Sequence, residues 1–367
     1  MTILNLFLLS IYTLVHGSTF NDVGNSISLL LGNGNGSFQN QQIHQLAYHP
    51  SFIAKGDFNN DSKLDLVVAS NSDNSVNILF GNNNGTFQNG TRYATVSSPL
   101  AVIVADLNNN NELDLATSNF GNNTVSILLD DGNRSFKNPI NYIINAFPIS
   151  LTTGDLNSDS YLDLVTCNIH NGSISVLLSN GNGTFKESQL YDITHNPSSI
   201  IVDDFNNDHK LDIAMAHIDT NHVSVLLGNG NGTFQSQKMF EISSKSTSLT
   251  VADFNKDKNL DIVATDFSEK SISVLLGKGD GTFHIRTTHE VGHNPSSVTI
   301  GDFNNDSMID LATANYGDNS VSILLGKGNG EFEKQVNFQV QNNPSGIIVG
   351  DFNTDGKLDL AVANSNV

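Results

Sequence analysis

Acidic and amide side chains recur at fixed spacing along this chain of 367 residues. Each copy of the pattern reads Asp, Phe or Leu, Asn, any residue, Asp or Asn, two further residues, Leu or Ile, and a closing Asp at position 9. The seven copies lie 49 residues apart and begin at Asp57, Asp106, Asp155, Asp204, Asp253, Asp302 and Asp351. Side-chain oxygens at positions 1, 3, 5 and 9 of a tightly curved loop converge on one point, which predicts a binding site for a hard cation.

Calcium is the ion that this set of oxygen atoms predicts, because Ca²⁺ takes about 6–8 oxygen ligands whereas Mg²⁺ gives up its waters reluctantly. Zinc favours Cys and His, which are scarce in these loops. Without a cation, three carboxylates in one loop would repel one another. We expect up to seven Ca²⁺ ions, one in each loop, with the backbone carbonyl at position 7 and water completing the shell. The predicted ligands are Asp57, Asn59, Asp61, Lys63, Asp65, Asp106, Asn108, Asn110, Glu112, Asp114, Asp155, Asn157, Asp159, Tyr161, Asp163, Asp204, Asn206, Asp208, Lys210, Asp212, Asp253, Asn255, Asp257, Asn259, Asp261, Asp302, Asn304, Asp306, Met308, Asp310, Asp351, Asn353, Asp355, Lys357 and Asp359.

Two other interpretations of the loop were weighed. An EF-hand requires flanking helices and a Glu at position 12, and this loop has neither. Metal-free Asx-turns also use Asp and Asn, and they stay open as the alternative. Among the seven loops, the one at 351–359 should bind calcium most tightly because Gly356 suits a sharp turn. The loop at 106–114 should bind most weakly because Asn110 removes one charge.

A second pattern, Leu-Leu-Gly-x-Gly-x-Gly-Thr-Phe with small variations, keeps the same period. Short apolar runs surround both patterns, and in the fourth copy they predict strands at 198–202, 211–216, 223–227 and 238–242. No stretch has helical periodicity over 10 residues, so no helix is predicted. A proline precedes the first strand of nearly every repeat, and Ser246 replaces it once.

Seven four-stranded units without insertions predict an all-β fold, a seven-bladed β-propeller of antiparallel blades. The repeat is incomplete at both ends of the sequence, and the part missing at one end is the part present at the other. The last blade should therefore be shared by residues 24–48 and 345–367, and pairing of the N-terminal with the C-terminal strands should close the ring. We assign residues 18–367 to this single domain.

The formal net charge is −20, and 20 aspartates among the 37 acidic residues lie in the seven loops. No basic stripe is present to neutralise phosphates, so nucleic acid is excluded as a partner. Residues 1–17 read as a signal peptide with an apolar core at 3–15, which predicts a secreted protein. No segment is long and apolar enough to span a membrane. The single cysteine, Cys167, occupies a position of small residues and is expected to be inert packing.

The loop pattern Asp-x-Asn-x-Asp-x-x-x-Asp, followed by the glycine-rich pattern, resembles the FG-GAP/VCBS repeat over about residues 24–367. It is similar to the seven-bladed propeller of integrin α subunits and to integrin-like fungal lectins. The resemblance implies calcium ligands at positions 1, 3, 5, 7 and 9 of each loop. In the family only some blades usually carry metal. No inserted domain, leg region or membrane segment is seen, so the chain does not resemble a whole integrin subunit.

Strand order places the Asp loops and glycine turns on one face and the variable connections on the other. That second face carries aromatic and histidine residues that suggest a recognition surface, although ordinary loop variation is the alternative. They are Tyr48, His49, Phe120, Phe147, His170, His195, Phe267, His293 and Tyr316. Ten Asn-x-Ser/Thr sequons predict a glycoprotein. They are Asn35, Asn60, Asn84, Asn89, Asn122, Asn133, Asn171, Asn182, Asn231 and Asn305.

We expect a monomeric extracellular binding or adhesion module whose partner is a protein or a glycan. A lectin is a narrower form of this hypothesis. A carbohydrate-active enzyme is the less favoured alternative, because no catalytic set stands apart from the repeat and neither Asp219 nor Glu269 has a visible partner. A purely structural matrix component is the fourth possibility.

Overall fold

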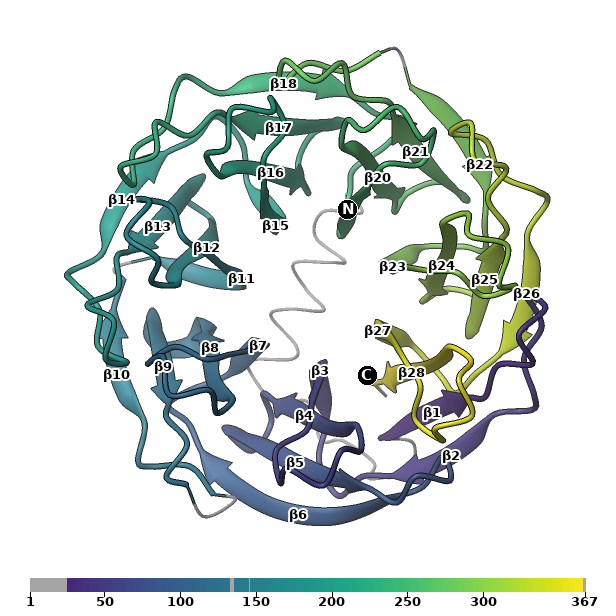
Figure 1. Ribbon diagram of the computed structural model, residues 1–367, viewed down its shortest axis with the longest axis horizontal. Coiled ribbons are helices and arrows are strands. Elements are labelled where there is room, and N and C mark those ends of the chain that lie inside the picture. Colours follow the sequence, from purple (N-terminus) through teal and green to yellow (C-terminus); the bar gives the residue numbers. More distant parts are fainter. Residues whose placement is uncertain (1–24, 133–134, 145, 285, 366–367) are drawn as a thin grey trace.

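The computed structural model describes residues 25–132, 135–144, 146–284 and 286–365. These residues form seven four-stranded antiparallel sheets arranged as a closed ring (Figure 1). The predicted signal peptide, residues 1–17, lies outside the described residues. The predicted seven-bladed propeller is confirmed.

Each blade runs outward from the ring axis, with its first strand innermost and its fourth strand on the rim (Figure 1). Blade 1 holds β3 (Pro50–Gly56), β4 (Asp65–Ser70), β5 (Ser75–Gly81) and β6 (Phe87–Ala94). Blade 2 holds β7 (Pro99–Ala105), β8 (Asp114–Asn119), β9 (Thr124–Leu128) and β10 (Ile140–Ile143). Blade 3 holds β11 (Phe147–Gly154), β12 (Asp163–Ile169), β13 (Ser173–Leu177) and β14 (Gln189–Asp192). Blade 4 holds β15 (Pro197–Asp203), β16 (Asp212–His217), β17 (His222–Leu226) and β18 (Lys238–Glu241).

The last three blades follow the same order. Blade 5 holds β19 (Leu249–Ala252), β20 (Asp261–Asp266), β21 (Ser271–Leu275) and β22 (Thr287–Glu290). Blade 6 holds β23 (Pro295–Gly301), β24 (Asp310–Asn315), β25 (Ser320–Leu324) and β26 (Val336–Gln339). Blade 7 holds β27 (Pro344–Gly350) and β28 (Asp359–Asn364) from the C-terminal part, and β1 (Ser26–Leu30) and β2 (Gln42–Gln45) from the N-terminal part.

Blade 7 closes the ring as predicted. Strand β1 pairs antiparallel with β28, in a register that runs from Ser26 opposite Asn364 to Leu30 opposite Leu360 (Figure 1). Leu30 is 1% exposed and Leu360 is fully buried. The first and last described strands of the chain therefore share one hydrophobic blade, and this pairing joins the two ends of the fold.

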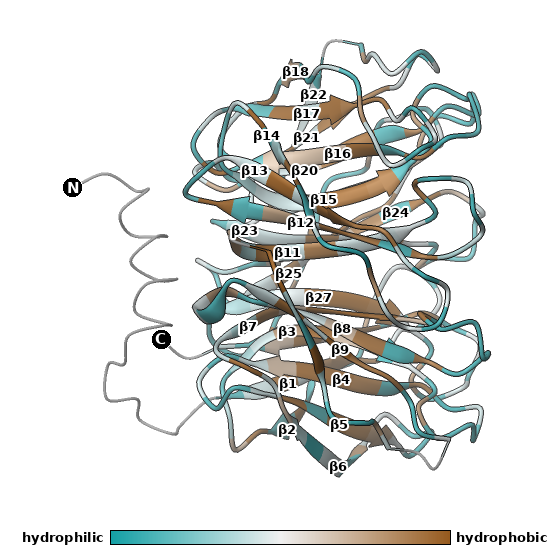
Figure 2. Ribbon diagram, turned by 90° about the vertical axis from the view of Figure 1, so that its left-hand side faces the viewer, coloured by the Kyte–Doolittle hydropathy of each residue, from teal (hydrophilic) through white to brown (hydrophobic). Residues whose placement is uncertain are grey.

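The second strand of each blade is buried along its whole length, as β4 and β16 illustrate. These strands are rich in Leu, Ile, Val and Ala because both of their faces pack against neighbouring blades. The outermost strands, such as β14, are largely exposed. Coloured by hydropathy, the strands are mostly hydrophobic and the connecting loops mostly hydrophilic (Figure 2).

Predicted strand boundaries agree with the structure to within one residue. In blade 4 the predicted strands at 198–202, 211–216, 223–227 and 238–242 correspond to β15, β16, β17 and β18. The one helical element among the described residues is a single 3-10 turn, η1 (Phe120–Asn122), which strand periodicity could not predict. No helix of the described part is long and apolar enough to cross a membrane.

The proline prediction needs correction. Proline lies within the innermost strand, not before it: it is the first residue in five blades and, as Pro148, the second residue of β11. A bulge follows it, as between Pro50 and Phe52. Because proline lacks an N–H, it fits a position where the ladder is already irregular. In blade 5, where Ser246 replaces proline, β19 starts three residues later, at Leu249.

A buried polar residue ends the second strand of each blade. In blade 2, Asn119 donates from Nδ2 to Thr124 Oγ1 at 3.2 Å and to Ser126 Oγ at 2.8 Å. Asparagine recurs here in blades 3, 6 and 7. Blade 4 has His217 instead, whose Nε2 lies 2.7 Å from Ser224 Oγ. Blade 5 has Asp266, which accepts hydrogen bonds from Ser271 and Ser273. Blade 1 has Ser70 at this position, so three blades depart from asparagine at a fully buried site.

Candidate metal centre

The Asp loops join the first and second strands of each blade, and two left-handed residues curve each of them. In the first loop these are Asn60 at position 4, with φ of 54°, and Ser62 at position 6, with φ of 62°. Every loop repeats this geometry at both positions. Gly356 is the only glycine at position 6, with φ of 78°, and there it avoids the strain that a side chain incurs. The ranking of that loop as the tightest calcium site stays a prediction.

Side chains at positions 1, 3 and 5 turn into the loop and accept its backbone N–H groups. Asp57 Oδ1 accepts from Asp61 N at 3.1 Å, and Asp57 Oδ2 accepts from Ser62 N at 2.7 Å. Asn59 Oδ1 accepts from Asp61 N, and Asp61 Oδ1 accepts from Lys63 N. The carboxylate at position 1 does the same in all seven loops. In six of the seven loops the structure thus brings the first three predicted ligands together.

The carboxylate at position 9 lies beneath the loop and is fully buried. Asp65 accepts one hydrogen bond from Phe58 N at 2.9 Å and one from Gly81 N at 2.8 Å. Gly81 begins the glycine-rich turn between the third and fourth strands, so this carboxylate ties the loop to the turn. The same pair of bonds occurs in every blade, at Asp114, Asp163, Asp212, Asp261, Asp310 and Asp359.

Burial raises the pKa of these seven aspartates to about 6, and the two backbone donors only partly offset it. In six of the loops, the carboxylates at positions 1 and 5 raise the pKa of the position-9 carboxyl further, as Asp57 and Asp61 do for Asp65. In the second loop only Asp106 contributes from within the loop, because position 5 is Asn110. The loop therefore concentrates negative charge that a divalent cation would neutralise.

The loop side chains supply carboxylate and amide oxygens, which are the type of ligand atom that calcium binds. Among the described residues, no three His, Cys, Asp or Glu side chains are grouped so that they could hold a metal ion. The calcium ligands named from the sequence therefore stay predictions. At position 7 of three loops, Lys63, Lys210 and Lys357 pair with the position-5 carboxylates at 3.0–3.4 Å. A lysine side chain cannot bind a cation, so in these loops the backbone carbonyl of position 7 is the candidate ligand.

The second loop differs from the others at position 3. Asn108 directs its Nδ2 atom at Asp114 Oδ2, 2.9 Å away, instead of accepting a hydrogen bond from position 5. In the other six loops the position-3 oxygen accepts that bond. This loop lacks a carboxylate at position 5 and has its position-3 oxygen turned out of the loop. Both features agree with the prediction that it binds most weakly.

Each loop also contacts the next blade through its position-2 residue. Phe58 in blade 1 packs edge-on against Phe136 in blade 2, with ring centroids 6.1 Å apart. A backbone hydrogen bond also joins the Asp loop to the next blade: in the loop of blade 6, Phe303 O accepts from Gly36 N in the glycine-rich turn of blade 7, at 2.8 Å. These contacts place the Asp loops and the glycine turns on one face of the ring, which confirms that part of the sequence prediction.

A second aromatic contact joins neighbouring blades at all seven interfaces. The Phe that ends each glycine-rich turn packs against an aromatic or His side chain of the preceding blade's outermost strand. The pairs are Phe87 with His44, Phe136 with Tyr93, Phe185 with Tyr142, Phe234 with Tyr191, Phe283 with Phe240, Phe332 with His289, and Phe38 with Phe338. The Phe repeat was recognised in the sequence but its partner was not, although the partner recurs with the same 49-residue period and could have been found from that signal.

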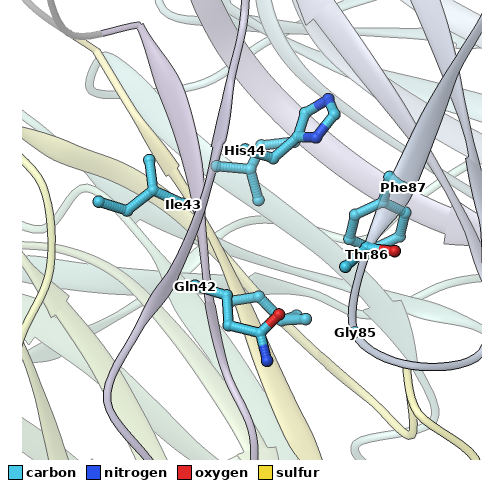
Figure 3. Close-up of a pocket in the computed structure, with 8 residues that line it drawn as sticks. Gln42, Ile43, His44, Gly85, Thr86 and Phe87 are labelled. Carbon is cyan, nitrogen blue, oxygen red and sulfur yellow. The ribbon is translucent and has the colours of Figure 1, made fainter.

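A small cavity lies between blades 7 and 1, beside one of these pairs (Figure 3). Its volume is about 80 Å³, and its lining includes Ile43 and His44 of β2 and Phe87 of the neighbouring blade. Ligand pockets for small molecules usually enclose about 300–1,000 Å³. This cavity is therefore not a candidate active site.

The opposite face brings three of the predicted recognition residues together. The rings of Phe120, Phe147 and His170 lie 5.3–6.2 Å apart, and we call these three residues the aromatic patch. Phe147 is 38% exposed. It begins β11, whose other end leads into the third Asp loop, so the patch lies on the face away from the loops.

The statement that Asp219 has no partner is corrected by the structure. Asp219 Oδ1 lies 3.7 Å from His195 Nδ1, and its Oδ2 accepts a hydrogen bond from Asn196 N. The His195 ring lies 6.1 Å from the ring of buried His217. Burial lowers the pKa of His217 to about 4, so its ring is neutral at pH 7. The sequence missed this group because the three residues come from two connections and a strand end that meet only in the folded blade.

The fold and its loops define the class: a seven-bladed propeller with an oxygen-rich loop in every blade. A family model described as the FG-GAP-like repeat matches residues 57–117, 106–166, 155–215, 204–264, 253–313 and 302–362. The chain belongs to this FG-GAP-like repeat family.

Solved structures that resemble the chain share its fold at low sequence identity. A lectin from Agrocybe aegerita that recognises non-reducing terminal N-acetylglucosamine is 16% identical, with a TM-score of 0.56, and the match covers 94% of this chain and 96% of the lectin. Virginiamycin B lyase from Staphylococcus aureus is 13% identical, with a TM-score of 0.60 and coverage of 93% and 100%. The BBS1N chain in complex with ARL6DN is 14% identical, with a TM-score of 0.60 and coverage of 88% and 95%. No curated protein matches the sequence.

Proposed function

We propose that this chain is a secreted, monomeric, calcium-stabilised binding module that recognises an extracellular protein or glycan without turning it over. The observation that carries the binding role is the convergence of Phe120, Phe147 and His170 on the face away from the Asp loops. These residues come from two different blades. Phe147 and His170 are exposed, and exposed rings that lie together are typical of recognition surfaces, whereas Phe120 is buried with Ile169 and Ile218 and supports the two exposed rings. The repeat does not require them, because Phe147 corresponds to Ser98 and Asn196 in the neighbouring blades.

In this proposal calcium is structural. The residues at positions 1, 3, 5 and 9 of each loop, with the carbonyl at position 7, would hold the ion. Calcium would supply positive charge to a loop whose position-9 carboxyl is buried beside two further carboxylates. The loop residues in turn contact the next blade, so an ordered loop supports the joint between blades.

A binding experiment tests the patch. Purified wild type, Phe147→Ala and Ile143→Ala are applied to an extracellular extract and to a glycan array, with and without calcium. Ile143 is the matched control because it is 67% exposed but lies on the outermost strand β10. We expect saturable binding by wild type and Ile143→Ala and loss of binding by Phe147→Ala. Equal binding by all three variants would contradict the role of the patch.

The glycan array also separates a lectin from a protein-binding module. The exposed Phe147 ring beside a His side chain favours a sugar ligand, since aromatic rings bury the apolar faces of their ligands while polar neighbours make hydrogen bonds. The lectin from Agrocybe aegerita with the same fold adds support at the level of fold alone. Binding to immobilised glycans that free monosaccharide competes away would favour the lectin form.

A further inference from the structure

Five of the seven glycine-rich turns carry an Asn-x-Ser/Thr sequon at the same repeat position. They are Asn35, Asn84, Asn133, Asn182 and Asn231. Asn133 lies outside the described residues, and the other four side chains are exposed. Their blades, 7, 1, 2, 3 and 4, are consecutive around the ring, and blades 5 and 6 have no sequon at this position (Figure 1).

The turn uses the oxygen of this asparagine and leaves its nitrogen free. Asn84 Oδ1 accepts hydrogen bonds from Thr86 N at 3.0 Å and from Thr86 Oγ1 at 2.7 Å. Asn182 and Asn231 accept the same two bonds from Thr184 and Thr233. Within the described residues, the Nδ2 atoms of these asparagines donate no hydrogen bond.

The fold does not need an amide at this position. In blade 5, Asp280 Oδ1 accepts the same two bonds from Thr282, and in blade 6 Asn329 accepts one from Glu331 N. Both turns form without a sequon. In the four sequon turns that the structure describes, the free nitrogen therefore has no structural role.

Two other sequons differ, because their nitrogen is already engaged. Asn60 Nδ2 donates to Glu112 Oε2 of the next loop at 2.9 Å, and Asn305 Nδ2 donates to Gly34 O at 3.4 Å. Both also lie at position 4 of an Asp loop with left-handed φ. A sugar on either nitrogen would separate neighbouring blades at the loop face.

We propose that Asn35, Asn84, Asn133, Asn182 and Asn231 are N-glycosylated. A crown of glycans would then stand over the loop face of blades 7 and 1–4, and the loop face of blades 5 and 6 would stay bare. The amide nitrogen bonds to the anomeric carbon of an oligosaccharide carried on a lipid diphosphate. The bond from that carbon to the diphosphate oxygen breaks, the lipid diphosphate leaves with the electron pair, and an amide proton passes to a base of the transferase.

This proposal rests on the proposed secretion, because the transfer takes place in a secretory compartment. On the loop face, a large partner would then reach the bare sector over blades 5 and 6. The crown would also keep other chains away from most of the Asp loops.

The experiment expresses the whole chain behind an added secretion leader in eukaryotic cells and maps glycans by peptide mass spectrometry, before and after enzymatic removal of N-glycans. We expect sugar at the five turn asparagines and none at Asn60 or Asn305. Asn84→Asp, which copies the turn of Asp280, should remove one glycan and leave the melting temperature of the deglycosylated protein unchanged. Bare turn sites on secreted protein, or occupied Asn60 and Asn305, would overturn the proposal. Expression without the added leader tests secretion separately.

Discussion

The ring of Phe352 in blade 7 packs edge-on against the ring of Phe87 in blade 1, with centroids 6.0 Å apart. Phe352 occupies position 2 of an Asp loop, and its N–H donates to Asp359 Oδ2 at 2.9 Å. Phe87 ends the glycine-rich turn of the next blade. Phe352 therefore connects the buried carboxylate of its own loop to the interface between blades 7 and 1.

Replacing this side chain should weaken the closed ring. We expect Phe352→Ala to lower the free energy of unfolding by roughly 3–5 kcal/mol, because it empties a site that is 3% exposed. Urea denaturation followed by fluorescence or circular dichroism measures the change. Phe352→Leu is the matched control, since Leu107 and Leu156 occupy this repeat position in blades 2 and 3, and it should cost much less. Equal losses from both variants would contradict this account, because they would show that the filled volume of the site is not what stabilises the ring.

His217 should make stability depend on pH. In the unfolded chain its pKa is near 6.5, whereas burial lowers it to about 4 in the folded protein. Between these two pKa values the unfolded chain binds a proton at His217 and the folded protein does not. The contribution of neutral His217 to the free energy of unfolding is therefore fully present above about pH 6.5 and is lost as the pH falls toward 4. His217→Asn installs the residue found here in four other blades.

We expect His217→Asn to lose less stability than wild type between pH 7 and pH 5, measured by urea denaturation at both values. His170→Asn is the control, because it changes an exposed histidine that has left-handed φ, a conformation that asparagine tolerates. An unchanged pH dependence in His217→Asn would show that this ring does not titrate as described.

The second Asp loop offers a test of metal affinity. Asn110→Asp restores the carboxylate that the other six loops have at position 5. We expect calorimetric titration with calcium to show one added or tightened site relative to wild type, because a third carboxylate strengthens attraction for the ion. Asn111→Gly tests the neighbouring position 6, whose φ is 66°, without adding charge. A titration of Asn110→Asp that matches wild type would contradict the ranking of the loops.

Most of the fold could be predicted because the repeat determines it. Strand positions, the shared seventh blade and the separation of the two faces all follow from a 49-residue period, since each blade makes the same contacts with its neighbours. The pairing of Ser26 with Asn364 follows from the same phase argument. Of the two positions that curve each loop, only position 6 was predicted, from Gly356 in the loop at 351–359, and position 4 was not.

Features outside the repeat could not be predicted. Phe120 and Phe147 lie 27 residues apart in different blades, and only the angle between the blades brings their rings within 5.5 Å. His195 meets Asp219 through two connections whose conformations have no repeated pattern. The bulge after Pro50 was missed because it depends on ladder geometry, which residue types do not specify.

The central claim is that cations organise the Asp loops, and thermal unfolding of the purified chain in calcium and in chelator tests it most directly. A metal held only by the folded state stabilises it by about 2.7 kcal/mol per site at 100 times its Kd. We therefore predict a large rise in melting temperature in millimolar calcium, with magnesium at the same concentration giving a much smaller one. Identical melting curves in calcium and in chelator would contradict the account, because they would mean that the loops hold their shape through hydrogen bonds alone.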